Sequence, residues 1–584
     1  MRRKHILLMI TALLCGFQVA VAIPARPGRF TVTQPDGTRL TLERRGDEWG
    51  HWLVNTSGQM VRQEEDGFYR IVSDADAAAF RQVASARRQS ARQARARRAA
   101  RSGGNVIEGQ RRFLVILVEF SDLGFTLENP REAYIRMLNE TGYSDYGGTG
   151  SAREYYMDNS GGRFEPVFDV FGPVTLPEEF AYYGRNDSSG NDQHADEAVA
   201  EGCKALDGEV DFSDYDNDGD GKVDLVFMYY AGYGEADGGS SSTIWPHQWE
   251  LSTAGVDLTL DGVVLDSYAC SNELVGSTAR KGEMDGIGTV CHEFGHAIGL
   301  PDFYDTDYDW NGTAGGLYSY SLMSAGSYNN DGRTPPYLNF EERMLLGWLD
   351  ESGYREFPVS GVYEIPPVNE NVAYRTFTDM DGEYFVYENR AKTGWDLYLP
   401  AEGMVVYHVD KSSRQVGSYT AGELWEDWAM TNIINAKGSH PCFYIVPAAR
   451  QSSLNYYYES QIPFPRADVD TYVPLSWNKV EGSVSFSGIT FEDGMVRLRA
   501  TLPSEELDYP TIADAGTYRA GERFTFSLLL PEGVDAPAAV SWYYDDEPVA
   551  ADSVTLTAGD HTVEARYRSA AGREEILTLE ITVN

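Results

Sequence analysis

The sequence predicts a multidomain protein in which a mixed α/β (α+β) unit is followed by a β-sandwich and an immunoglobulin-like β domain. A chain of 584 residues is long enough for several domains. Residues 113–120 form a continuous apolar run typical of a buried strand, and residues 192–206 carry a helical pattern. From residue 361 the chain changes to short alternating apolar runs divided by turn residues, which indicates all-β structure.

The first 22 residues predict an export signal. A basic start is followed by an apolar run that ends in Ala20-Val21-Ala22. We expect a cut after Ala22 and a secreted or cell-surface protein. A retained membrane anchor is the alternative, but this run is short for one. No other stretch is long and apolar enough to cross a bilayer, so we predict no membrane span in the mature chain.

The mixed unit is assigned to residues 106–350, and its most informative segment is residues 291–302. This segment contains His292, Glu293 and His296, the H-E-x-x-H arrangement that binds zinc and supplies a general base. On a helix the two histidines share one face because they are four residues apart. The apolar residues fall near the opposite side, as expected of a core-facing stripe: Ile287, Val290, Phe294 and Ile298.

Gly299 and Pro301 predict the end of this helix, because glycine suits a left-handed cap and proline cannot continue a helix. The chain then presents Asp302 near the histidines. A catalytic zinc takes three protein ligands and leaves a fourth position for water. We therefore assign His292, His296 and Asp302 to one zinc ion. Three other aspartates lie close enough in sequence to compete with Asp302: Asp305, Asp307 and Asp309.

These residue types predict hydrolysis. Zinc lowers the pKa of a bound water to about 7. Glu293 is expected to accept a proton from this water as it attacks a peptide carbonyl, and then to protonate the leaving amine. The alternative interpretation is a surface helix with two solvated histidines.

Residues 319–327 resemble the methionine-containing turn beneath the zinc of metzincin peptidases. Met323 follows a motif that matches the metzincin pattern through Gly299 but has Asp302 at the position of the usual third histidine. Ordinary core packing is the alternative for a lone methionine. Tyr328, just after this turn, is a candidate for stabilising the tetrahedral intermediate or for packing.

Together these segments resemble the immune inhibitor A group of secreted bacterial metallopeptidases. The likeness covers roughly residues 110–500. Besides the motif ending at Asp302, it rests on residues 151–156, 160–162, 231–234, 244–247, 304–305, 322–327, 346–349, 394–396 and 403–410. The resemblance implies zinc-dependent endopeptidase activity, calcium for structural stability and an aspartate as the third zinc ligand.

A second metal site is predicted from the acidic stretch at residues 216–224. Asp216, Asp218, Asp220 and Asp224 take positions 1, 3, 5 and 9 of a calcium loop. The match is incomplete, because position 12 is Phe227 and the following residues look like a strand. We predict a shortened loop that binds structural calcium, with a merely acidic turn as the alternative.

Residues 23–105 differ from the rest of the chain. They begin with two strand patterns around a Pro-Asp-Gly turn and end in an alanine-, glutamine- and arginine-rich block at residues 77–101. We predict a propeptide whose basic connector is cut by a trypsin-like protease or autolytically. A solvated helix face or a linker is the alternative.

Four cysteines remain after the signal, too few for a disulfide scaffold. We expect Cys270 and Cys291 to form a bridge that pins the connection before the zinc helix, since export permits one.

Two β-rich modules are predicted beyond the mixed unit. Residues 351–503 are assigned to a β-sandwich and residues 504–584 to an immunoglobulin-like domain. Trp542 suits the core tryptophan of such a domain, although the paired cysteines of antibody domains are absent.

The net charge of −41 excludes nucleic acid and anionic membrane surfaces as expected partners, because both require basic patches. We predict a monomer acting on protein or peptide substrates. A calcium-stabilised adhesin with an inactive peptidase scaffold is the alternative function, but an adhesin has no use for Glu293. A zinc peptidase clan with a distant glutamate ligand is disfavoured by Gly299 and Met323.

Overall fold

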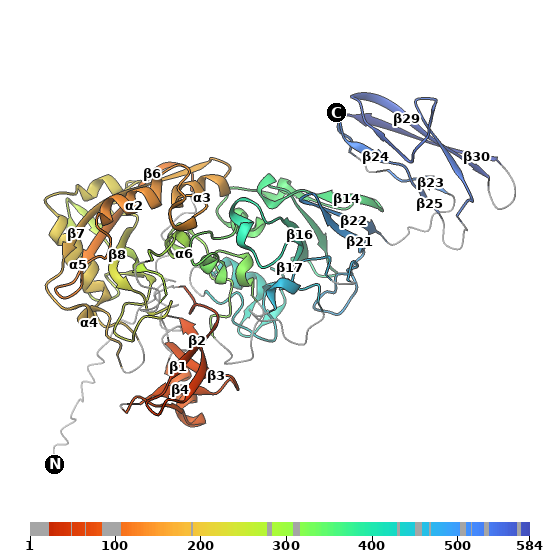
Figure 1. Cartoon of the computed structure of the whole chain (residues 1–584). Helices are drawn as coiled ribbons and strands as arrows, with labels where there is room; N and C mark the ends of the chain where they lie inside the picture. Colours follow the sequence, from red (N-terminus) through yellow and green to blue (C-terminus); the bar gives the residue numbers. More distant parts are fainter. Residues whose placement is uncertain are drawn as a thin grey trace, which may run out of the picture.

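The computed structural model divides into an N-terminal sheet, a mixed α/β domain, a two-sheet β domain and a C-terminal β domain (Figure 1). It describes residues 23–47, 50–64, 66–83, 107–187, 191–276, 283–307, 316–428, 432–449, 458–466, 469–502, 510–514, 517–530, 536–568 and 574–584. The predicted signal and most of the arginine-rich block lie outside these residues. Within them, no helix has the length and apolar character to cross a bilayer.

Five antiparallel strands in chain order form the N-terminal sheet. They are β1 (Arg29–Thr33), β2 (Arg39–Asp47), β3 (Gly50–Asn55), β4 (Met60–Gln63) and β5 (Tyr69–Ile71). β1 and β2 pair around the Pro-Asp-Gly turn as predicted. The sheet contacts the mixed domain through His51. Its ring stacks on Trp245 with centroids 4.4 Å apart, and its Nε2 lies 2.8 Å from Glu235 Oε1.

The mixed domain is built on a five-stranded sheet of order β7-β6-β8-β12-β9. The strands are β6 (Gly109–Glu119), β7 (Phe164–Thr175), β8 (Val226–Tyr233), β9 (His247–Glu250) and β12 (Ser267–Leu274). All neighbours are parallel except the edge strand β9. A small hairpin of β10 (Leu258–Leu260) and β11 (Val263–Leu265) stands beside it.

Helices cover both faces of this sheet, which explains why its central strands read as continuous apolar runs. Successive residues of β6 alternate between two cores, with Val115 in one and Leu114 in the other. The Val115 face carries α2 (Pro130–Asn139), α3 (Ala152–Asn159) and α6 (Ile287–Ile298). The Leu114 face carries α4 (Phe180–Tyr183) and α5 (Ala195–Leu206). The short α7 (Phe340–Leu345) ends the domain.

The next domain consists of two facing sheets. The larger has the order β13-β15-β16-β17-β20 and the smaller β14-β22-β21. Their bounds are β13 (Tyr354–Arg355), β14 (Gly361–Ile365), β15 (Ala373–Phe377), β16 (Glu383–Arg390), β17 (Gly403–Asp410), β20 (Phe443–Val446), β21 (Ser485–Glu492) and β22 (Met495–Thr501). A hairpin of β18 (Gln415–Val416) and β19 (Tyr419–Thr420) precedes α8 (Ala421–Glu426).

The larger sheet is buried on both faces. Tyr387 and Val406 pack against the smaller sheet, whereas Val386 and Val405 belong to the same core as the zinc helix α6. The mixed domain and the two-sheet domain therefore share one hydrophobic core. This shared core ties the β domain to the geometry of the predicted site.

The C-terminal β domain stands apart in Figure 1 and has its own core. Trp542 stacks on Phe526 in this core, with ring centroids 5.2 Å apart. The strands are β23 (Thr511–Ile512), β24 (Arg523–Thr525), β25 (Leu528–Leu529), β26 (Val540–Tyr544), β27 (Glu547–Val549), β28 (Ser553–Thr555), β29 (Gly559–Arg568) and β30 (Glu574–Val583). The longest sheet has the order β27-β26-β29-β30.

Candidate metal centre

The helix α6 carries two of the three predicted zinc ligands, His292 and His296, and ends where the sequence indicates. Gly299 adopts a φ of 122°, and its N–H donates to the Gly295 carbonyl at 3.0 Å. Phe294 anchors the helix on the sheet, with its ring centroid 4.6 Å from that of Phe113 in β6. The whole helix except Ala297 is at least half-buried, so its orientation is fixed by packing.

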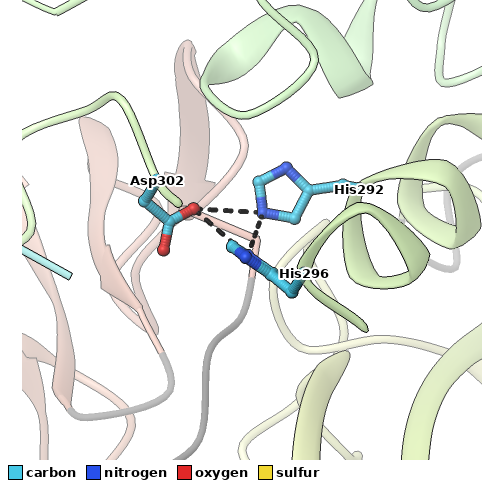
Figure 2. A group of neighbouring side chains, drawn as sticks. All are labelled: His292, His296 and Asp302. Carbon is cyan, nitrogen blue, oxygen red and sulfur yellow. Dashed lines mark hydrogen bonds and ion pairs between the residues drawn. The ribbon is translucent and has the colours of Figure 1, made fainter. Parts of the chain in front are cut away.

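Three ligand atoms converge at this helix (Figure 2). Asp302 Oδ1 lies 3.3 Å from Nε2 of His292 and 3.3 Å from Nε2 of His296. The two Nε2 atoms are 3.1 Å apart. Asp305 and Asp307 are not in this group, and Asp309 lies outside the described residues.

The remaining hydrogen bonds of the histidines determine which ring nitrogen faces the centre. His292 Nδ1 is 2.8 Å from the Leu322 carbonyl, and His296 Nδ1 is 2.8 Å from the Leu300 carbonyl. A carbonyl oxygen only accepts, so each Nδ1 carries the proton. Both Nε2 atoms of the neutral rings therefore present lone pairs to each other and to a carboxylate oxygen, an arrangement that calls for a cation.

Zinc fits this centre. Bonds of 2.0–2.1 Å in tetrahedral geometry place neighbouring ligand atoms about 3.3 Å apart, close to the observed separations. Asp302 Oδ1 has no hydrogen-bond partner among the described residues although it is buried. Burial alone would raise the pKa of Asp302, but His296 and His292 lower it below its usual value. This lowering requires protonated imidazoles; with the neutral rings described above, a bound cation would take that role and keep the carboxylate charged.

Glu293 lies beside the three ligands and is fully buried. Its Oε1 accepts a hydrogen bond from the backbone nitrogen of Ile23 at 2.8 Å. Its Oε2 has no partner within the described part of the chain. Burial raises the pKa of the Glu293 carboxyl to about 8, so its carboxylate form is a stronger base than that of an exposed glutamate.

The segment that reaches Glu293 comes from the start of the N-terminal region. Ile23 is buried with Trp245, whose Nε1 donates to the Ile23 carbonyl at 3.2 Å. Tyr328 donates its hydroxyl proton to the Pro24 carbonyl at 2.7 Å. Burial raises the pKa of Tyr328 well above its usual value, so the hydroxyl remains a donor. This contact is with the main-chain carbonyl of the next residue after Ile23 and favours a role for Tyr328 in binding peptide backbone.

Met323 lies against the middle of the zinc helix. A Cβ on Gly295 would be 2.9 Å from the Met323 sulfur, so a larger residue at 295 would require the methionine side chain to shift. The preceding Leu322 supplies the carbonyl that fixes His292. Residues 321–324 therefore form the floor of the centre, in the place proposed for the methionine turn.

Asn432 is a site residue that the sequence did not reveal. Its Nδ2 donates to Asp302 Oδ2 at 2.6 Å, and its Oδ1 accepts from the Asp302 backbone N–H at 2.8 Å. This pair of bonds turns the other carboxylate oxygen, Oδ1, toward the histidines. Asn432 lies 130 residues from Asp302 and carries no local pattern, so no sequence signal pointed to it.

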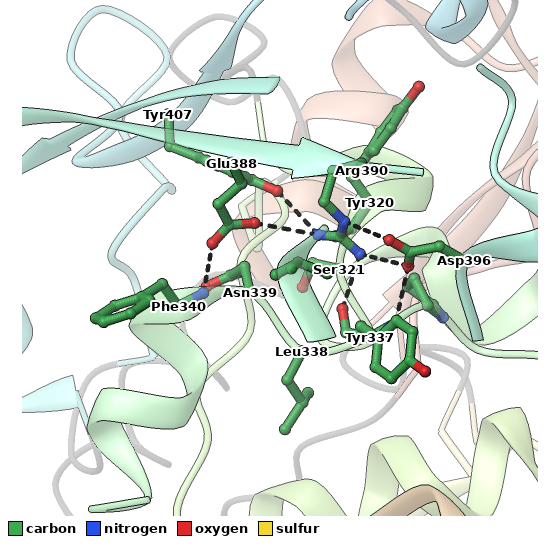
Figure 3. Close-up of polar contacts among 12 residues, drawn as sticks. Tyr320, Ser321, Tyr337, Leu338, Asn339, Phe340, Glu388, Arg390, Asp396 and Tyr407 are labelled. Atoms are coloured by element: carbon green, nitrogen blue, oxygen red, sulfur yellow. Dashed lines mark hydrogen bonds and ion pairs between the residues drawn. The ribbon is translucent and has the colours of Figure 1, made fainter. Parts of the chain in front are cut away.

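A buried arginine of the β domain supports the floor of the centre (Figure 3). Arg390 at the end of β16 binds both oxygens of Asp396 at 2.7 Å. It also donates to the carbonyls of Tyr320 at 3.1 Å and Tyr337 at 2.9 Å. Asp396 outweighs the effect of burial and raises the pKa of Arg390 well above its usual value. The guanidinium of Arg390, from the neighbouring domain, thus fixes the backbone of the segment before Met323 through the Tyr320 carbonyl.

The acidic loop precedes β8, so a strand follows it as the sequence indicates. Carboxylate oxygens of Asp216, Asp218 and Asp224 lie within 4.8 Å of one another. Asp220 does not join this group, and its carboxylate accepts from the Lys222 N–H at 2.9 Å. Burial and, to a lesser extent, the neighbouring Asp218 carboxylate raise the pKa of Asp224 to about 6.

The predicted bridge between Cys270 and Cys291 is wrong for this structure. Both thiols are free and buried, as are Cys203 and Cys442. Cys270 in β12 faces the core on the α5 side of the sheet, whereas Cys291 in α6 belongs to the core on the opposite side. The sheet itself separates the two sulfur atoms.

Comparison with known proteins shows a family match over the mixed domain. Residues 102–344 match the family described as "Immune inhibitor A peptidase M6, catalytic domain". The chain is 28% identical over 263 residues to the pre-pro-metalloprotease PrtV of Vibrio cholerae serotype O1, covering 38% of this chain and 28% of PrtV. It is 27% identical over 251 residues to Immune inhibitor A of Bacillus thuringiensis subsp. alesti, covering 37% of this chain and 36% of that protein.

The match thus spans about a third of the length of these relatives. A crystal structure of OgpA from Akkermansia muciniphila aligns over 83% of this chain and 96% of its own. Its sequence identity is 11% and its TM-score is 0.21, a likeness too low to bear on fold or site.

Proposed function

We propose that the chain is a secreted zinc endopeptidase made as a precursor, a proposal supported by the match of residues 102–344 to the immune inhibitor A peptidase M6 family. The observation that carries the proposal is the convergence of two imidazole lone pairs and an unpaired carboxylate oxygen within 3.3 Å. His292, His296 and Asp302 hold the zinc. Proteins and peptides are the substrates.

Each residue around the metal has its own task. Zinc, when bound, acts as a Lewis acid that lowers the pKa of water and polarises a carbonyl. Glu293 accepts the proton of the attacking water and delivers it to the leaving amine. Tyr328 binds the substrate main chain or stabilises developing charge through its hydroxyl. Met323 and Leu322 form the floor, as in metzincin peptidases, and Asn432 orients Asp302.

The N-terminal segment accounts for the precursor. Ile23 bonds to the general base, and Trp245 and Tyr328 bond to the first two carbonyls of the segment. A substrate needs the same groups. Residues 23–105 therefore act as a propeptide that blocks the centre until the basic connector is cut.

Removal of the metal tests this function. The processed protein, beginning near residues 88–112, is expected to hydrolyse casein, to lose this activity with a zinc chelator and to regain it with added zinc. The uncut precursor should show little hydrolysis. Asp302→Ala should bind less than one zinc per chain, and Asn432→Ala should bind zinc about 10- to 100-fold more weakly. The exposed control Asp257→Asn should keep its zinc, and normal zinc content in Asp302→Ala would refute the ligand assignment.

We further propose that Asp216, Asp218 and Asp224 bind calcium that stabilises the mixed domain. Millimolar calcium acting on a weak extracellular-type site contributes about 1 kcal/mol to the free energy of unfolding. Melting curves with and without calcium should therefore differ for the wild type but not for Asp216→Asn or Asp224→Asn. Asp220→Asn is the matched control and should retain the shift. A calcium-independent melt of the zinc-loaded wild type would contradict the site.

The domain limits follow from the same reasoning. We propose a signal at residues 1–22, a propeptide at 23–105, the peptidase at 106–350, a β-sandwich at 351–503 and an immunoglobulin-like domain at 504–584. The shared core between α6 and β17 supports a peptidase that works together with the β-sandwich. The separate core around Trp542 supports an independent C-terminal module.

A further inference from the structure

The side chain of Arg26 is held by two carboxylates beside the metal centre. Its Nη1 donates to Asp237 Oδ1 at 2.7 Å, and its Nη2 donates to Asp331. Its guanidinium carbon lies 5.7 Å from the centroid of the Tyr328 ring. The Asp237 side chain is only 8% exposed and also accepts from the Gly276 N–H. A guanidinium is thus bound between two acidic side chains and an aromatic ring.

The position of Arg26 relative to a scissile bond follows from the Ile23 contact. In peptide hydrolysis the general base donates its proton to the leaving nitrogen. The backbone nitrogen of Ile23 lies 2.8 Å from Glu293 Oε1, the place of that leaving nitrogen. Ile23 therefore corresponds to the first residue after the scissile bond, and Arg26 to the fourth.

Most contacts of this segment are available to any peptide. The carbonyls of Ile23 and Pro24 accept from Trp245 and Tyr328, and the Arg26 N–H donates to the Ala236 carbonyl at 3.0 Å. These bonds use the main chain and carry no preference for a side chain. Sequence selection on this side falls to the groups that contact the side chains of Ile23 and Arg26.

We propose that Asp237 and Asp331 form a subsite for a basic side chain at the fourth residue after the scissile bond of the substrate. The proposal rests on the function proposed above. Once the propeptide leaves, the two carboxylates lose the Arg26 guanidinium between them; Asp331 keeps Arg333 at 3.9 Å, and Asp237 remains near Asp285. A substrate arginine restores the pairing. Arginine should bind better than lysine, because its planar group reaches both carboxylates and the Tyr328 ring together.

Matched peptides test the preference in the processed, zinc-loaded protein. Four peptides that differ only at the fourth residue after the scissile bond carry arginine, lysine, norleucine or glutamate. We expect kcat/KM to be about tenfold higher for arginine than for norleucine, with lysine between them and glutamate lowest. In the double variant Asp237→Asn/Asp331→Asn the arginine-to-norleucine ratio should fall to about one. Asp257→Asn should keep the wild-type ratio, and equal rates for arginine and glutamate in the wild type would overturn the subsite.

A second measurement does not depend on catalysis. In the zinc-loaded precursor the N–H groups of Ala25 and Arg26 are bonded to the carbonyls of Gly46 and Ala236. Hydrogen exchange of these two amides should be about tenfold faster in Arg26→Glu and in Asp237→Asn/Asp331→Asn, and nearer to wild type in Arg26→Lys. If no peptide is cleaved, the proposed function fails but this exchange still decides the subsite. Unchanged exchange in the aspartate double variant would overturn it.

Discussion

Glu293→Gln is expected to reduce peptide hydrolysis by the processed protein by about 10²- to 10⁴-fold while leaving one zinc per chain. Glutamine has nearly the same shape as glutamate but cannot accept a proton at neutral pH. Glu293 is not one of the three ligand residues, so the metal should stay bound. The measurements are kcat/KM on a peptide that the wild type cleaves and the zinc content of the same sample.

Activity and zinc content together should distinguish the general base from the ligand residues. Asp302→Ala should lose activity together with zinc, whereas Glu293→Gln should lose activity alone. A surface variant such as Glu128→Gln controls for the loss of one negative charge. If Glu293→Gln kept a tenth or more of the wild-type kcat/KM, another residue would have to supply the base.

The zinc helix could be predicted because its information is local. The spacing of Val290 and Phe294 gives the buried face, and Gly299 gives the end of the helix with its positive φ. The 3.6-residue period then places both imidazoles on the face opposite Phe294. The central strands β6 and β8 were predictable for a similar reason, since burial on both faces leaves an apolar run at residues 113–118 of β6 and apolar or tyrosine residues at 226–230 of β8.

The contacts that complete the centre could not be predicted, because they join segments far apart in the chain. Asn432 meets Asp302 across 130 residues, and Ile23 meets Glu293 across 270. The sequence predicted a cut before Ile23 but did not indicate that Ile23 lies against Glu293. The bridge from Cys270 to Cys291 failed because short sequence separation does not reveal that a sheet lies between two side chains.

The acidic loop at residues 216–224 could be predicted from the sequence only in part. Its spacing predicted four aspartate ligands, and the structure gathers three. In this tight loop backbone N–H groups bond to the carboxylates of Asp216, Asp218 and Asp220 alike, so the spacing does not show which carboxylates converge. Position in the motif therefore located the acidic loop but not which of its carboxylates lie together, and calcium binding stays a prediction.

Arg390→Met is expected to lower the free energy of unfolding by about 3–5 kcal/mol. The side chain is fully buried, and its removal leaves the carboxylates of Asp396 and Glu388 without their cation. The carbonyls of Tyr320 and Tyr337 also lose their donor. Thermal unfolding followed by tryptophan fluorescence measures the loss.

Because the peptidase and the two-sheet domain share one core, Arg390→Met should lower one common transition of both domains. Zinc affinity should fall as well, since Arg390 holds Tyr320 two residues before the carbonyl that fixes His292. Arg390→Lys keeps the charge but not the planar fork, and it should lie between Met and wild type. Arg497→Met, on the exposed side of the same domain, is the matched control and should melt like the wild type. Separate transitions, with only the β domain affected, would show that the arginine does not couple the two domains.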